Sequence, residues 1–239
     1  MSQVELLRFK DDRELAQSAA KQWVVQLQNL ASTSNRYCVA LSGGRIARRF
    51  FESVFTRAKY CDLSLGSMHF FWGDERCVPP TDSESNFAVA RELLLTPMGI
   101  SAENIHRIRG EDPPEPASIA AQAELCKVAT INRSGHPVLE MIFLCLGEDG
   151  HVASLFPGES EELITDARIY RPVIAAKPPP RRITLGYSTI AAAKEVWVLA
   201  SGSGKENALR DSLGPGGRTP LARVLQLRSQ TRVFTDIDT

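Results

Sequence analysis

The sequence carries no excess of either charge. Its 239 residues include 28 basic and 28 acidic side chains, which gives a formal net charge of zero. Proteins that bind nucleic acid or an anionic membrane surface through electrostatics usually carry a basic patch or a basic overall charge. The composition therefore supports neither a nucleic-acid partner nor a membrane partner.

Paired cysteines and metal-binding motifs are also lacking. The five cysteines are scattered without a CxxC pair, and such an odd set favours a reducing compartment over a disulfide framework. The four histidines form no HExxH motif and no close His/Cys spacing, so we expect no metal site. We assign His69 to a strand, and His106 and His136 to loops.

Long hydrophobic runs are absent as well. No segment is apolar for long enough to span a membrane, and residues 1–14 become charged too early for a signal peptide. With the unpaired cysteines, this predicts a cytoplasmic protein. No linker is long enough to divide the chain, so we predict a single α/β domain over residues 1–239.

Short apolar runs alternate with helical segments along the chain. We predict strands at residues 4–9, 36–41, 68–72, 141–146, 182–186, 196–200 and 231–234. We predict a helix that is capped by Asp11 or Asp12 and reaches residue 30, and a helix that opens at residues 83–86 and runs to about residue 95. Further helices are predicted at about 45–59, about 117–132 and 220–225, and one more ends near residue 213. Residues 111–116 are assigned to a surface loop and residues 157–180 to an irregular segment. The alternation implies an open, mostly parallel, doubly wound sheet with helices on both faces.

The segment MIFLCLGEDGHVASLFPG, residues 141–158, is the centre of this pattern. Its unbroken apolar start is typical of a buried parallel strand, and the polar turn that follows contains Asp149 and His151. Ligands of open α/β sheets bind just beyond the carboxyl ends of such strands. We therefore consider His151 a candidate functional residue, although a histidine in a surface turn is the plainer alternative.

Three further turns follow predicted strands, namely SGG at 42–44, GDER at 73–76 and SGSGK at 201–205. If the strands are parallel, these turns and the histidine turn share one edge of the sheet and line one crevice. Ser42, Gly43 and Gly44 precede a helix, where free backbone N–H groups favour phosphate, and Arg45 adds positive charge. A tight turn with a solvent-facing arginine is the alternative.

The other two turns each contain a candidate cation. The guanidinium of Arg76 can bind phosphate or carboxylate oxygens in a bidentate manner, although it could instead belong to a solvated cluster with Asp74. Lys205 lies near a helix start, where a basic residue does not favour the helix dipole. A ligand role explains that position, and a surface lysine is the alternative.

The turn that contains His151 is similar to the signature of the 6-phosphogluconolactonase family, which has the form G-x-G/D-x-DGH-x-ASLFPG. The resemblance continues through LSGG at 41–44, DER at 74–76, SESN at 83–86, PRRITLG at 180–186 and SGSGK at 201–205. These blocks occur in the family's order and span most of the chain. The resemblance implies the open α/β fold that the family shares with glucosamine-6-phosphate deaminases and ribose-5-phosphate isomerases.

The resemblance also implies roles for individual residues. His151 matches the catalytic base, and Asp149 matches a residue that supports the active-site turn. The residues that match the phosphate-binding and sugar-orienting positions are Gly43, Gly44, Arg76 and Lys205. Asn86 matches a position near the pocket, and Arg182 matches the arginine of the family's RIT block.

One block departs from the family pattern. Family members usually have LSGGSTP, whereas this chain has LSGGRIA, so Arg45, Ile46 and Ala47 replace two hydroxyl side chains and a proline. A hydroxyl that would bond to phosphate is therefore missing. Arg45 is a candidate substitute for it, and the departure concerns phosphate affinity more than the hydrolytic residue.

The resulting hypothesis is the hydrolysis of 6-phospho-D-glucono-1,5-lactone to 6-phosphogluconate in the oxidative pentose phosphate pathway. The partner is a small phosphosugar lactone, and the scheme requires no metal and no organic cofactor. A sugar-phosphate isomerase or deaminase of the same fold group is one alternative, although Arg76 and the ASLFPG ending argue against it. A sugar-phosphate-binding protein that has lost catalysis is another. We further predict that Arg76 and Lys205 meet across the mouth of the pocket and hold the phosphate.

Overall fold

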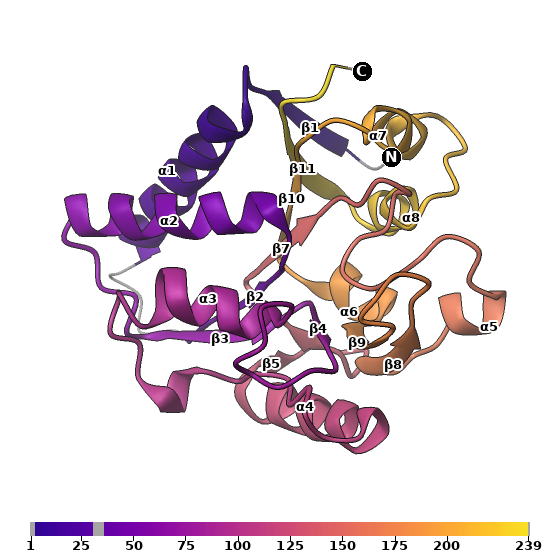
Figure 1. Ribbon diagram of the computed structural model, residues 1–239, viewed down its shortest axis with the longest axis horizontal. Coiled ribbons are helices and arrows are strands. Elements are labelled where there is room, and N and C mark those ends of the chain that lie inside the picture. Colours follow the sequence, from indigo (N-terminus) through magenta and orange to yellow (C-terminus); the bar gives the residue numbers. More distant parts are fainter. Residues whose placement is uncertain (1–2, 31–35, 239) are drawn as a thin grey trace.

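The computed structural model describes residues 3–30 and 36–238 of the chain and has a six-stranded sheet at its centre (Figure 1). The strand order is β1-β11-β10-β7-β2-β3, and every neighbouring pair is parallel. The strands are β1 (Gln3–Arg8), β2 (Tyr37–Leu41), β3 (Met68–Trp72), β7 (Met141–Cys145), β10 (Glu195–Ala200) and β11 (Gln230–Thr235). The predicted parallel, doubly wound sheet is confirmed.

Strand β7 lies inside the sheet between β10 and β2, as its unbroken apolar sequence predicts. The ring of Phe143 in this strand packs against aromatic rings from the helices that cover one face of the sheet. Its centroid lies 4.8 Å from that of Trp23 and 4.6 Å from that of Phe50. The strand that precedes the His151 turn is thus paired with a neighbouring strand on each edge and packed against helices on this face.

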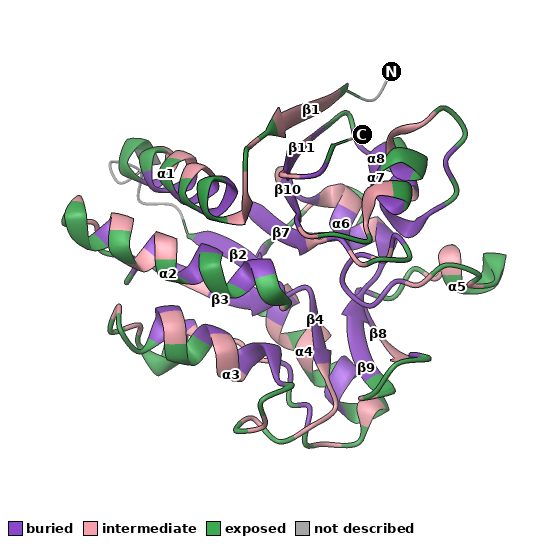
Figure 2. Ribbon diagram, turned by 45° about the horizontal axis from the view of Figure 1, so that its top comes forward, coloured by how far each residue is buried: buried purple, intermediate pink, exposed green. Residues whose placement is uncertain are grey.

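Helices cover both faces of the sheet (Figures 1 and 2). One face carries α1 (Asp12–Leu30), α2 (Arg45–Tyr60) and α3 (Asn86–Ala90), which continues as a π-helical turn over Arg91–Leu95. The other face carries α6 (Tyr187–Ala192), α7 (Glu206–Leu213) and α8 (Pro220–Leu227). Figure 2 shows buried residues concentrated along the sheet between these layers.

A second, antiparallel sheet has the order β4-β9-β8, with β4 (Asp74–Arg76), β9 (Arg181–Leu185) and β8 (Tyr170–Ile174). The prediction that residues 73–76 form a turn was therefore wrong. Gly73 joins the two sheets instead, because its N–H donates to Leu41 O and its carbonyl accepts from Leu185 N, each at 2.8 Å. The chain passes directly from β3 of the first sheet into β4 of the second.

The assignment of residues 157–180 as irregular was also wrong, because this segment contains α5 (Glu161–Ile164) and β8. The sequence of β8, YRPVI, is not typical of a strand, since it contains a proline and an arginine. Arg171 is buried there because its guanidinium is paired with Glu159 at 2.7 Å. Pro172 is tolerated because β8 lies at the edge of its sheet.

The helix predicted over residues 117–132 begins earlier and ends earlier than expected. Helix α4 spans Pro114–Val128, so half of the predicted loop at 111–116 is helical. Prolines fit the first turn of a helix, where their missing N–H groups have no partner to lose. The chain then forms a short hairpin from β5 (Thr130–Ile131) and β6 (Pro137–Val138), which the sequence analysis missed along with α6.

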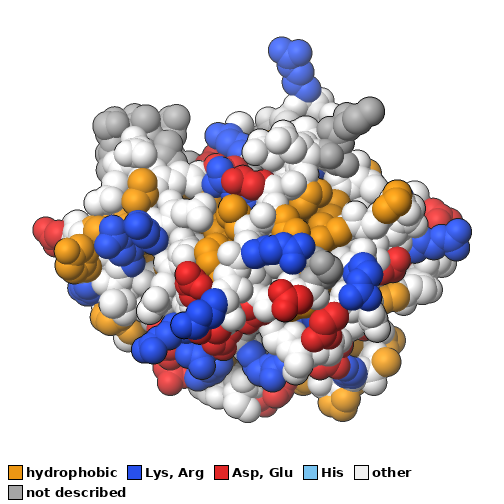
Figure 3. All heavy atoms as spheres, turned by 90° about the horizontal axis from the view of Figure 1, so that it is seen from above, with side chains coloured by type: hydrophobic (Ala, Val, Ile, Leu, Met, Phe, Trp, Pro, Cys, Tyr) orange, Lys and Arg blue, Asp and Glu red, His pale blue; other side chains and the backbone are white. Residues whose placement is uncertain are grey.

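The surface in Figure 3 carries interspersed basic and acidic side chains, in keeping with the balanced charge of the chain. Within the residues that the structure describes, no helix combines the length and the apolar character needed to cross a membrane.

Candidate active site

A pocket of about 270 Å³ lies beyond the carboxyl ends of β2 and β7, where the second sheet meets the first. The β2–α2, β7 and β10–α7 turns contribute to it, as do strands β4 and β9 and the loop that precedes β9. The lining residues are Ser42, Gly43, Gly44, Arg45, Ile46, Asp74, Arg76, Asn86, Cys145, Leu146, Gly147, Glu148, His151, Ala153, Lys177, Arg182 and Lys205. The four segments that the sequence analysis singled out thus meet in one place.

The β2–α2 turn forms one wall of the pocket and depends on its glycines. Gly44 has a φ of 104°, a conformation that favours glycine, and α2 begins at the next residue. A Cβ atom on Gly43 would collide with the carboxamide of Asn86. The hydroxyl of Ser42 is buried and has no hydrogen-bond partner within the described part of the chain, so it can bind a ligand.

The β7 turn places His151 at the pocket with one ring nitrogen already engaged. The Nδ1 atom of His151 lies 2.5 Å from Oδ1 of Asp149, and the same oxygen accepts the His151 backbone N–H at 3.1 Å. The ring packs over Gly147, where a Cβ atom would collide with it. Partial burial raises the pKa of Asp149, but the contact with His151 outweighs it and lowers the pKa below its ordinary value.

Two arginines enter the pocket from the second sheet. Arg76 in β4 is the register partner of Arg182 in β9. The Nη1 atom of Arg76 donates to the Glu84 carbonyl at 3.0 Å and lies 3.1 Å from the Glu84 carboxylate, while its buried Nε has no hydrogen-bond partner among the described residues. The alternative pairing of Arg76 with Asp74 is not observed. Burial lowers the pKa of Arg182, and the charge of Arg76 adds to that effect, so an anion between them would relieve the repulsion.

The position of Arg76 differs from its expected origin. The sequence pattern predicts Arg76 at the carboxyl end of a parallel strand, but it lies within an antiparallel strand of the second sheet. It reaches the pocket because β4 continues directly from β3 through Gly73. Arg76 and Lys205 line the same pocket, and their meeting across its mouth stays a prediction.

Lys205 immediately precedes α7 and faces the pocket beside Arg45. Burial lowers the pKa of Lys205, and the charge of Arg45 lowers it further. A Cβ atom on Gly202 would lie 3.6 Å from Nη2 of Arg45, so the arginine extends along the β10–α7 turn. Arg45 is exposed at the pocket edge, whereas Lys205 is partly buried.

Nine of the ten predicted site residues line this pocket, and the tenth, Asp149, contacts it through His151. Their functional roles stay predictions. Asp74, Glu148 and Lys177 also line the pocket, although no site role was predicted for them. The charged residues of the DER block could have indicated a site role for Asp74. The proline-rich segment around Lys177 contains no pattern that indicates such a role.

A buried carboxylate network fixes Asn86 at the pocket wall. The side chain of Asn86 donates to the backbone carbonyl of Asp74 at 2.9 Å and to its carboxylate at 3.2 Å. The carboxylate of Glu75 accepts the backbone N–H groups of Asn86 at 2.7 Å and Phe87 at 2.8 Å. Burial raises the pKa of Glu75 to about 7, although these hydrogen bonds oppose the shift. Glu75 therefore anchors the start of α3, and Asp74 orients Asn86.

The remaining histidines lie outside the pocket. His69 Nδ1 is 2.9 Å from His106 Nε2, and His106 Nδ1 is 3.0 Å from the Glu124 carboxylate. His69 is in β3, and His106 and His136 are in loops, as predicted. Among the described residues, no group of three or more His, Cys, Asp or Glu side chains is arranged to hold a metal ion.

The chain matches a known family over most of its length. A sequence profile of the glucosamine-6-phosphate isomerases/6-phosphogluconolactonase family matches residues 10–234. The chain therefore belongs to this family.

Individual relatives carry the name of one branch of the family. The chain is 36% identical to a 6-phosphogluconolactonase of Treponema pallidum over 173 residues, which cover 72% of this chain and 70% of the relative. It is 30% identical to a 6-phosphogluconolactonase of Mycobacterium leprae over 230 residues, which cover 92% of this chain and 91% of the relative.

Solved structures agree with this placement. The 6-phosphogluconolactonase of Trypanosoma brucei superposes with a TM-score of 0.88 at 25% identity, covering 98% of this chain and 97% of that one. A monomeric glucosamine-6-phosphate deaminase superposes with a TM-score of 0.80 at 17% identity, covering 97% of this chain and 96% of the deaminase chain. The second likeness shows the shared fold alone.

Proposed function

We propose that this chain is a hydrolase that opens 6-phospho-D-glucono-1,5-lactone to 6-phospho-D-gluconate, a step of the oxidative pentose phosphate pathway. The names of its relatives and its membership of the family support this reaction. The observation that carries the proposal is the presence of the His151–Asp149 pair in a pocket that also contains several cationic side chains. These cationic residues are Arg45, Arg76, Lys177, Arg182 and Lys205.

His151 acts as the general base in this proposal. Its Nδ1 faces the Asp149 carboxylate, and this contact favours the tautomer in which Nε2 has a free lone pair. Nε2 removes a proton from water while the water oxygen attacks C1 of the lactone. The imidazolium then returns the proton to the ring oxygen as the C1–O bond breaks, and the new carboxylic acid ionises in solution. Asp149 orients the ring and stabilises its charged form.

The cationic wall binds the phosphate in this proposal. The unpartnered Nε of Arg76 and the ammonium of Lys205 offer charge-assisted hydrogen bonds, which are stronger than neutral ones. The backbone amides of Gly43 and Gly44 lie at the start of α2, where the helix dipole favours an anion. Arg182 and Asn86 orient the hydroxyl groups of the sugar acid. The unpartnered hydroxyl of Ser42 is a further hydrogen-bonding group for the substrate.

The site needs no metal or organic cofactor in this scheme, because the base, the water and the cations complete the reaction. We also propose that residues 1–239 form a single domain and that the enzyme acts in the cytoplasm. The five cysteines are free, which supports a reducing compartment. Burial raises the pKa values of four of them, Cys38, Cys77, Cys126 and Cys145, which favours the protonated, less reactive thiol.

Substrate turnover tests the assigned reaction directly. Purified protein is incubated with the phosphorylated lactone, and acid release is measured against spontaneous hydrolysis. In parallel, it is incubated with glucosamine 6-phosphate, and ammonia is measured. We expect lactone opening without ammonia release. Ammonia release without lactone opening would instead assign the chain to the deaminase branch, and binding of 6-phosphogluconate without either turnover would identify a binding protein.

A further inference from the structure

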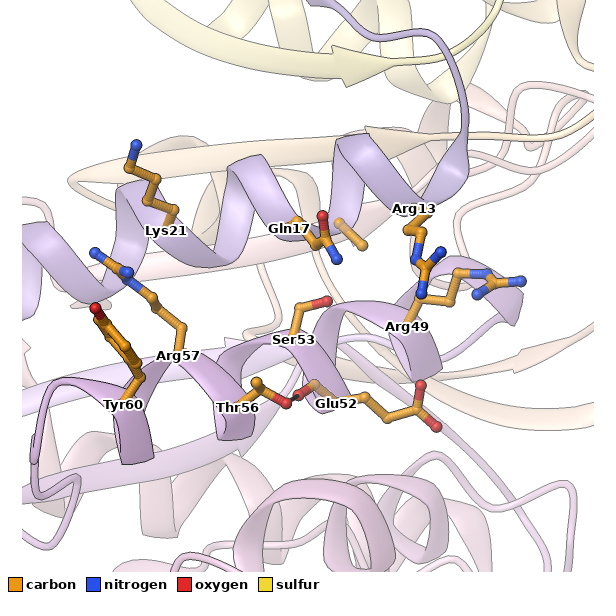
Figure 4. Close-up of a pocket in the computed structure, with 10 residues that line it drawn as sticks. Arg13, Gln17, Lys21, Arg49, Glu52, Ser53, Thr56, Arg57 and Tyr60 are labelled. Carbon is orange, nitrogen blue, oxygen red and sulfur yellow. Dashed lines mark hydrogen bonds between the residues drawn. The ribbon is translucent and has the colours of Figure 1, made fainter.

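A second hollow, of about 520 Å³, lies on the surface between α1 and α2 (Figure 4). We call it the α1–α2 groove. It is lined by Arg13, Ala16, Gln17, Lys21, Arg49, Glu52, Ser53, Thr56, Arg57 and Tyr60, and it shares no residue with the candidate active site. Its volume falls in the range of small-molecule binding sites.

Two facing rows of polar side chains build the α1–α2 groove. Helix α1 contributes Arg13, Gln17 and Lys21, which are spaced four residues apart and therefore lie on one side of the helix. Both basic residues of α1 belong to this row. Helix α2 contributes an equivalent row at positions 49, 53 and 57. Figure 4 shows the two rows on adjacent helices. The charge concentrated here contrasts with the zero net charge of the whole chain.

The two ends of the groove differ in charge balance. At one end, Arg49 is paired with Asp12 at 2.6 Å, and the carboxylate of Glu52 lies at the same end in Figure 4. At the other end, Lys21 and Arg57 line the groove together with Tyr60. Neither cation makes an ion pair with any residue in the described part of the chain. No acidic side chain lines the groove at this end, so its positive charge has no counter-charge among the lining residues.

Arg57 also has an unsatisfied hydrogen-bond donor. Its Nε is buried and has no hydrogen-bond partner among the described residues. The guanidinium carbon lies 5.3 Å from the ring centre of Tyr60, which is 81% exposed and leaves its hydroxyl accessible. A buried donor without a partner destabilises the folded state, and an anion with several oxygens would satisfy it. Arginine, lysine and a phenol together match the acceptor oxygens of a phosphate group.

We propose that the α1–α2 groove binds a phosphorylated small molecule whose phosphate lies between Lys21, Arg57 and Tyr60. The organic part of the ligand extends along the groove, where Gln17 and Ser53 can hydrogen-bond to hydroxyl groups. Sugar phosphates and nucleoside monophosphates share this chemistry.

The phosphate end of the groove is too far from the active site for one phosphate group to occupy both. Arg57 follows Arg45, which lines the active site, by twelve residues of α2, or about 18 Å along the helix axis. The groove is therefore a second site rather than an extension of the first, and it does not depend on the function proposed above.

Amide chemical shifts of the full chain test this proposal. The probes are ribose 5-phosphate and adenosine 5′-monophosphate, with ribose, adenosine and inorganic phosphate as comparisons. Protein with Lys205→Ala is used to weaken binding at the active site. We expect saturable shifts in α1 and α2 with at least one phosphorylated probe and none with the neutral compounds. The tighter of the two phosphorylated probes identifies the organic part of the ligand.

Charge-matched variants distinguish binding at a specific site from nonspecific electrostatic attraction. We expect Lys21→Gln and Arg57→Gln each to raise the dissociation constant of the phosphorylated probe at least tenfold. Lys59→Gln removes the same charge from the same turn of α2 but does not line the groove, so we expect less than a twofold change. No saturable shift at millimolar probe, or equal weakening by Lys59→Gln and Lys21→Gln, would overturn the proposal. Lys21→Gln lies on α1, so it tests the site even if Arg57→Gln fails to fold.

Discussion

The Nδ1 atom of His151 and the Oδ1 atom of Asp149 lie 2.5 Å apart within a single turn after the central strand. The same Asp149 oxygen also accepts the backbone N–H of His151, so the carboxylate fixes both the ring and the main chain. Because Nδ1 faces the carboxylate, Nε2 is the nitrogen left to act on substrate. This relationship gives the proposed base its orientation and its tautomer.

Asp149→Asn should lower kcat by about 10²-fold or more while leaving the fold intact, because the amide can stabilise the wrong tautomer and cannot stabilise the imidazolium. The measurement is the pH profile of kcat with the phosphorylated lactone. Glu148→Gln is the matched control, since it removes a neighbouring carboxylate that does not contact His151. Equal losses in the two variants would show that the Asp149 contact has no special role.

Arg76→Ala and Lys205→Ala should reduce kcat/KM for the phosphorylated lactone by roughly ten- to hundredfold each, because each removes a charged hydrogen-bond donor. Turnover of unphosphorylated glucono-1,5-lactone should change far less. Binding energy from the remote phosphate can also lower the chemical barrier, so both kcat and KM are measured. Equal losses on the two lactones would show that these residues do not recognise the phosphate.

Arg45→Ala tests the segment that departs from the family pattern. Arg45 lies at the pocket edge beside Lys205 and lowers its pKa. If Arg45 replaces the missing hydroxyl as a phosphate ligand, the variant should raise KM for the phosphorylated lactone about tenfold. The unphosphorylated lactone should be unaffected. An unchanged KM for both lactones would place Arg45 in solvent without a ligand.

Stability should fall on acidification because His69 and His106 are partly buried beside each other. Burial lowers the pKa of both residues, and each lies beside the other, while Glu124 opposes the shift at His106. The unfolded chain therefore binds more protons than the folded chain just below the ordinary histidine pKa of about 6.5. The stability that the two neutral histidines allow is fully present above that pH. It is lost as the pH falls from there through their pKa values in the folded chain.

The measurement is the free energy of unfolding between about pH 5 and pH 8, compared with the variant that carries His69→Gln and His106→Gln. We expect a shallower pH dependence in the variant. A steeper dependence, or an identical one, would show that the two histidines do not make this contribution.

The sequence predicts the parallel sheet well because β2, β3, β7 and β10 are mainly apolar runs, and the turns that follow these strands contain glycine. The run at residues 141–146 and the glycine-flanked turn after it predict both a central strand and the position of His151. Parallel strands place their carboxyl ends at one edge, so widely separated turns can be assigned to one pocket without knowledge of the contacts.

The second sheet could not be predicted in this way because its strands violate the simple pattern. Arg171 is buried in β8 only because Glu159, twelve residues earlier, neutralises it, and this pairing is a tertiary contact. Strand β4 is three residues long and is stabilised by pairing with β9, about a hundred residues later. Lys177 reaches the pocket from the loop between β8 and β9, so its position also depends on that sheet.

The central claim is that His151 is the base for lactone opening. The most direct measurement is the turnover of 6-phospho-D-glucono-1,5-lactone by the wild-type chain and by His151→Gln, corrected for spontaneous hydrolysis, with 6-phosphogluconate binding measured on both. We predict that the variant binds 6-phosphogluconate with little change but loses roughly 10²- to 10⁴-fold in turnover. Turnover equal to that of the wild-type chain, with binding unchanged, would contradict the assignment of His151 as the base.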